Sequence, residues 1–141
     1  MAETNEQDLW PEGFQKVGED SPLEILRQQA NLLAGKTGDL VRAEIEDTTS
    51  QFEDILTSHL SARFILVAPA MGGYRFVLFR VRYPVVGYPV EIFDAPFEDI
   101  FNLKADTPAK LREVLSHILR APETQRIIGS LMRECMARIS A

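Results

Sequence analysis

The side chains that most often perform chemistry are few in this 141-residue chain and are scattered along it. The two histidines, His59 and His117, lack neighbouring carboxylates or thiols at the spacing of a metal site. Glu113 lies four residues before His117, so on a helix the two would form a surface pair. Acidic pairs occur at 19–20, 46–47, 53–54 and 98–99, but nothing around them in the sequence would raise a carboxyl pKa for acid–base work. We therefore expect no metal, no cofactor and no catalytic residue.

The segment AGKTG at residues 34–38 shares three residues with a phosphate-binding loop. That motif requires a glycine where Ala30 stands, and it opens a helix, whereas Gly35 is expected to close one. Cys135 is the only cysteine, so no intramolecular disulfide can form. Its place in an apolar helical stripe indicates a buried, unreactive thiol.

Two arginines, Arg80 and Arg82, are predicted to share one face of a strand, with Arg75 on the other face. Such a pair could clamp an anionic group or a carboxylate of a partner. The alternative is that they form the solvated end of the strand or pair with the acidic first strand across the sheet.

The stretch YPVVGYPV, residues 83–90, contains Tyr83 and Tyr88, each followed by a proline. Prolines cannot donate to a sheet ladder, so we expect a corner between two strands, with Gly87 in the turn. A tyrosine and proline platform that receives a partner peptide is the alternative.

Residues 1–20 hold few aliphatic side chains and several carboxylates, which predicts a mobile acidic arm. Trp10 and Phe14 interrupt it. Such aromatics could anchor the arm on the protein's own sheet, or they could form a short linear motif that docks on another protein.

The remaining 121 residues are predicted to form one domain that starts with a helix. Ser21 can cap this helix, Pro22 takes its first position, Glu24 completes a capping box, and Gly35 would end it in the left-handed conformation. Residues 40–46 alternate polar and apolar side chains, which is typical of a strand with one buried face. Residues 50–60 are compatible with either a helix or a strand.

Two apolar runs around Gly72-Gly73 predict an antiparallel hairpin, with a loop longer than two residues or a bulge because of Pro69. The second strand reads as apolar on both faces, which would require cover on both sides. A short strand follows at 90–93, and residues 97–103 could add another. Pro108, after a capping Thr107, and Pro122 open two C-terminal helices. These elements predict an α+β domain: an antiparallel sheet of four or five strands with one N-terminal and two C-terminal helices packed against it.

The net charge of −6 is spread unevenly. Residues 1–60 carry 4 basic and 13 acidic side chains, residues 61–103 carry 4 of each, and residues 104–141 carry 7 basic and 4 acidic. Nucleic acid is disfavoured, because phosphate binding requires a concentrated basic field. The polar N-terminus does not look like a secretory signal, and no stretch is apolar enough to cross a membrane. We expect a cytoplasmic protein.

These patterns favour a non-enzymatic protein-binding module of the adaptor, chaperone or inhibitor type, acting as a dimer or within a complex. The predicted partner-binding residues are Trp10, Phe14, Tyr83, Tyr88, Arg80 and Arg82. The alternative is a small-molecule-binding protein or enzyme with a pocket between sheet and helices, using Arg80, Arg82, Tyr83, Tyr88 or His59 as polar contacts.

Overall fold

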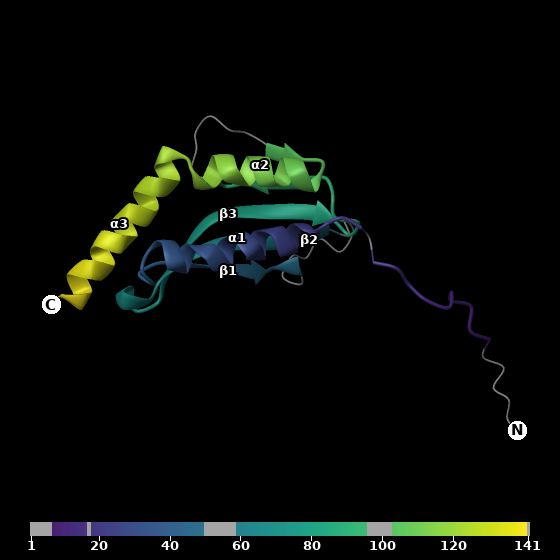
Figure 1. The fold of residues 1–141 in the computed structure, drawn as a ribbon, viewed down its shortest axis with the longest axis horizontal. Helices are drawn as coiled ribbons and strands as arrows, with labels where there is room; N and C mark the ends of the chain where they lie inside the picture. The colour runs from purple at the N-terminus through teal and green to yellow at the C-terminus, as the bar shows by residue number, and fades with distance from the viewer. Residues whose placement is uncertain (1–6, 17, 50–58, 96–102, 141) are drawn as a thin grey trace, which may run out of the picture.

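A computed structural model of the chain describes residues 7–16, 18–49, 59–95 and 103–140 (Figure 1). The elements are α1 (Pro22–Lys36), β1 (Arg42–Asp47), β2 (His59–Ala68), the 3-10 turn η2 (Pro69–Met71), β3 (Tyr74–Pro84), β4 (Val90–Phe93), β5 (Leu103–Ala105), α2 (Pro108–Leu119) and α3 (Pro122–Ile139). The strands form one antiparallel five-stranded sheet in the order β1-β2-β3-β4-β5. The predicted α+β fold is confirmed.

The helices begin where the sequence predicts. The Ser21 hydroxyl accepts a hydrogen bond from the Glu24 amide at 3.2 Å, and the Thr107 hydroxyl accepts one from the Lys110 amide at 3.1 Å. Each cap is followed by a proline in the first turn, where a missing amide costs nothing.

The end of α1 differs from the prediction, because Gly35 lies inside the helix. The left-handed residues are Gly38 (φ 61°) and Asp39 (φ 66°), and the Asp39 amide donates to the Ala34 carbonyl at 2.9 Å. The buried Thr37 hydroxyl joins the helix to the next strand by bonding both the amide and the carbonyl of Val41. These hydrogen bonds of Thr37 place the end of α1 after Gly35.

The hairpin between β2 and β3 turns through a longer loop, as predicted. Residues Pro69–Met71 form the turn η2, and Gly72 and Gly73 follow with φ of 69° and 79°. Pro69 lies outside the ladder, so its missing amide leaves no gap in the sheet.

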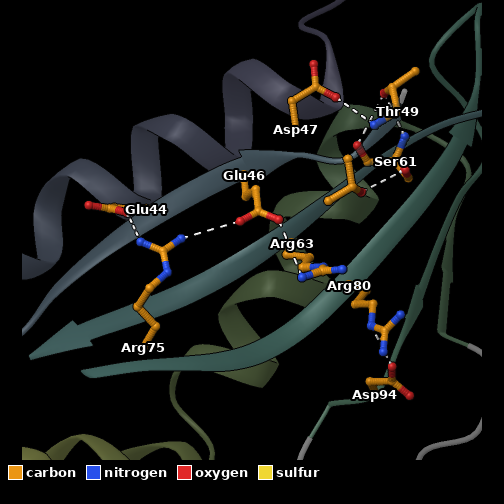
Figure 2. Close-up of polar contacts among 10 residues, drawn as sticks. Glu44, Glu46, Asp47, Thr49, Ser61, Arg63, Arg75, Arg80 and Asp94 are labelled. Carbon is orange, nitrogen blue, oxygen red and sulfur yellow. Dashed lines mark hydrogen bonds and ion pairs between the residues drawn. The ribbon is translucent and has the colours of Figure 1, made fainter. Parts of the chain in front are cut away.

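A β-bulge in β3 decides which side chains face the helices. Phe64 of β2 pairs with Phe79, but the next residue, Ile65, pairs with Val77, so Leu78 is an extra residue. The alternation of β3 is therefore inverted before the bulge. The prediction of a strand apolar on both faces is wrong. Arg75 lies on the same face as Arg80 (Figure 2), and the register places Arg82 there too.

The opposite face of the sheet carries the core. Phe79 stacks on Phe64 with ring centroids 4.9 Å apart, and both belong to one buried cluster with residues of α1 and α2. Its fully buried residues on these two helices are Ile25, Leu26, Leu111, Leu115 and Ile118. Both helices cover this single face, which satisfies the sheet without a second subunit (Figure 1).

Helix α3 packs against the hairpin end of the sheet and extends away from α2 (Figure 1). The Thr124 hydroxyl donates to the Ile118 carbonyl at 2.7 Å and fixes the corner between the two helices. Cys135 is buried, as predicted, but Met136, predicted on the same apolar stripe, is exposed, as is Ile139 at the end of the helix.

Two segments whose secondary structure the sequence left open lie mostly outside the described residues. For residues 50–60, only His59 and Leu60 are described, and both belong to β2. For residues 97–103, only Leu103 is described, and it begins β5.

Deleting Leu78 tests the bulge. Removal of this residue leaves a regular alternation in β3, so we expect the variant to fold and to lose about 2–5 kcal/mol of unfolding free energy, the cost of one buried leucine. Deleting Val81 instead would shift Arg82 into its position, where the side chain faces the core, so this control should fail to fold. Urea denaturation compares the two, and equal losses would contradict the inferred register.

Candidate functional site

The open face of the sheet carries a lattice of ion pairs (Figure 2). Arg75 contacts Glu44 at 2.8 Å and Glu46 at 3.4 Å, and Arg63 contacts Glu46 at 3.4 Å. The Arg63 Nε atom is buried and has no hydrogen-bond partner among the described residues. Long side chains from three strands thus cover Ile65 and Val67, which are buried although neither belongs to the core cluster that the described helices cover.

Arg80 and Arg82 share this face, as predicted, but each already has a carboxylate. Arg80 Nε lies 2.9 Å from Asp94, and Arg82 Nη2 lies 2.9 Å from Glu91. Glu91 belongs to β4 and Asp94 follows it, so neither carboxylate comes from the acidic first strand. Both pairs are exposed to solvent, so each contributes only about 0–1 kcal/mol to stability. The lattice neutralises the arginines and leaves no unpaired anion clamp at these two positions.

The Tyr-Pro segment forms the predicted corner between β3 and β4. The Gly87 amide donates to the Pro84 carbonyl at 2.8 Å, and Gly87 has a φ of 105°. Tyr83 is only 5% exposed, so its ring belongs to the core. The corner presents Val85 and Val86 to solvent and turns its tyrosines inward.

Asp20, just before α1, is held by side chains from two distant elements. The Tyr88 hydroxyl donates to the Asp20 carbonyl at 2.8 Å, and Arg112 of α2 contacts the Asp20 carboxylate at 2.6 Å. Burial raises the pKa of Tyr88 to about 12, although the Arg112 charge opposes the shift. These contacts fix the point where the N-terminal segment leaves the domain.

The described residues of that segment, 7–16 and 18–20, are called the arm below. Residues 7–16 form no helix or strand, and the chain extends away from the domain beyond the start of α1 (Figure 1). Trp10 and Phe14 are each 73% exposed, with their rings edge-to-face and centroids 5.8 Å apart. Leu9 is also exposed. The structure does not show the aromatics anchored on the chain's own sheet.

A groove of about 500 Å³ lies between α1 and α2 on the core side of the sheet. Its apolar lining consists of Leu32, Leu33, Phe64, Leu66, Leu115, Leu119 and Ile128. Its polar lining consists of Gln29, Lys36, Arg112, Ser116 and Arg120, three cations without a carboxylate. Lys36 and Arg120 form no ion pair with another described residue. The groove suits an apolar group that carries negative charge at its edge.

This groove was not predicted in detail from the sequence, and the polar contacts predicted for a pocket between sheet and helices were other residues. Arg80 and Arg82 point away on the open face, Tyr83 is in the core, and Tyr88 and His59 are outside the lining. The residue that could have indicated the groove is Leu32. It widens the apolar side of α1 beyond what the core covers, and it remains 53% exposed.

Comparison with protein-family models, curated proteins and solved structures finds no match. Among residues 7–16, 18–49, 59–95 and 103–140, no three metal-ligating side chains gather at a site that could hold an ion. No helix in the same ranges has both the length and the apolar character required to cross a bilayer.

Replacing Tyr88 with phenylalanine tests the hold on Asp20. The folded-state pKa of about 12 exceeds the ordinary 10.0, so this phenol's stabilising contribution is complete below about pH 10 and is lost as the pH rises through about 12. In a titration followed by tyrosine absorbance, Tyr88→Phe should shrink the step near pH 12. Burial also raises the pKa of Tyr83, so the variant is compared with the unsubstituted chain. An unchanged step in Tyr88→Phe would refute the assignment.

Proposed function

We propose that this chain is a non-enzymatic protein-binding module whose arm carries the docking residues. The observation that supports it is the exposure of Trp10 and Phe14 on a segment whose root is held by Tyr88 and Arg112. Exposing two aromatic rings is unfavourable in water, and large aromatic side chains supply much of the energy at protein interfaces.

The arm has the composition of a docking peptide. Between Gln7 and Glu19 it carries three carboxylates and one amine, a net charge of −2, around its three large apolar side chains. Acidic residues around an aromatic anchor favour a basic, apolar receiving surface. A fixed root restricts where the arm can reach and so lowers the entropic cost of docking.

The remaining predicted contacts are weaker candidates for this role. Arg80 and Arg82 are already paired and Tyr83 is buried, so their contact with a partner stays a prediction. Tyr88 acts through Asp20, as a positioning residue. The cytoplasm, where thiols stay reduced, fits the single buried Cys135.

A second candidate function is the binding of a small amphipathic anion. The groove between α1 and α2 has a volume in the range typical of ligand sites, roughly 300–1,000 Å³. Lys36 and Arg120 would receive the anionic end, and Leu32, Leu119 and Ile128 the apolar part.

Native mass spectrometry of the protein purified gently from its own cells separates the two functions. For the protein-binding module we expect a complex whose added mass is a polypeptide, lost in the double variant Trp10→Ala, Phe14→Ala. The equally exposed pair Val85→Ala, Val86→Ala is the matched control and should keep the complex.

A polypeptide complex unaffected by the arm substitutions, or its absence in every form, would contradict the proposal. An added mass of a small molecule, present in all three forms, would support the second function instead.

A further inference from the structure

We infer that the arm of one copy of this chain docks in the groove between α1 and α2 of a second copy, so that two copies exchange arms. The inference rests on the proposed protein-binding function and names its partner. It joins two exposed apolar features of the described chain: the arm residues Leu9, Trp10 and Phe14, and the groove around Leu32.

Chemical complementarity is the first argument. The groove offers an apolar floor at Phe64 and Leu66 and cations at its rim, and the arm offers aromatic rings with carboxylates beside them at Asp8 and Glu12. Arg112 is already paired with Asp20, which leaves Lys36 and Arg120 for the incoming carboxylates. Two rim cations thus meet residues 7–19, which carry a net charge of −2.

The direction of the arm favours a second copy over the chain's own groove. Arg112 both lines the groove and holds Asp20, so the arm begins beside one end of the groove. Asp20 is held at its carboxylate and its carbonyl, and from there the arm leads away from the domain, not back along α1 (Figure 1). The ten residues from Asp20 to Trp10 span up to about 35 Å when extended, enough to reach a neighbouring copy.

The size of the resulting contact fits a reciprocal exchange. One Trp and one Phe together bury roughly 300–500 Å², less than a stable interface requires. Two exchanged arms bury roughly 600–1,000 Å² of arm surface, to which the two receiving grooves add their own. This total approaches the lower end of the standard size, roughly 1,200–2,000 Å². The symmetric dimer is also the commonest form of soluble oligomer.

Trp10 is the only tryptophan, so its fluorescence reports the arm directly. In a dilution series of the full chain, we expect blue-shifted emission at high concentration that moves to the emission of a water-exposed indole as light scattering shows the mass fall from two chains to one. Leu32→Glu places a carboxylate in the groove and should raise the dissociation constant at least about ten-fold. Met136→Glu, at a position of similar exposure outside the groove, is the matched control and should leave it unchanged.

Other results would overturn the inference. Blue-shifted emission that is independent of concentration, with the mass of one chain, would show the arm in its own groove. Dimers that survive Leu32→Glu would place the contact elsewhere. Water-exposed emission at every concentration would exclude self-docking, while an arm-dependent complex with a different polypeptide in native mass spectrometry would still support the proposed function.

Discussion

The bulge that accommodates Leu78 in β3 preserves the sidedness of the whole sheet. Before it, the alternation of β3 places Arg75 and Val77 outward, and after it Arg80 and Arg82 point outward too. Without the bulge, one half of β3 would turn its charges toward α1 and α2 and its apolar side chains toward water. Because a one-residue slip reverses every side chain of a strand, placing Leu78 in a bulge and not in the regular ladder keeps one face a core and the other ionic.

Each face then serves a separate purpose. On the ionic face, four arginines meet carboxylates from β1, β4 and the residue after β4: Arg63, Arg75, Arg80 and Arg82. The apolar face is covered by two helices, but these leave a groove between them whose rim is basic. The negative charge concentrated in the first part of the chain and the positive charge of its last part therefore meet at α1 and α2, where Asp20 and Arg112 already pair.

Most of the fold could be predicted from local signals. Ser21, Thr107 and the prolines after them mark helix starts through backbone chemistry that neighbours do not change. The bulge could not be predicted, because Leu78 and Phe79 are both apolar and strict alternation gives no sign of an insertion. The candidate site could be predicted only in part. Trp10 and Phe14 stand out by residue type. The groove depends on how α1 and α2 pack together, and the partners of Arg80 and Arg82 depend on strand register, which the sequence does not specify.

The central claim is that the indole of Trp10 in one copy contacts the methyl groups of Leu32, Leu119 and Ile128 in another. The most direct measurement is an isotope-filtered NOE experiment on a mixture of labelled and unlabelled protein, in which only contacts between copies give signals. Arm exchange predicts cross-peaks from the Trp10 ring protons of one copy to those three groove methyls of the other. A dimer whose filtered spectrum connects Trp10 to other residues, or to none, would contradict the account.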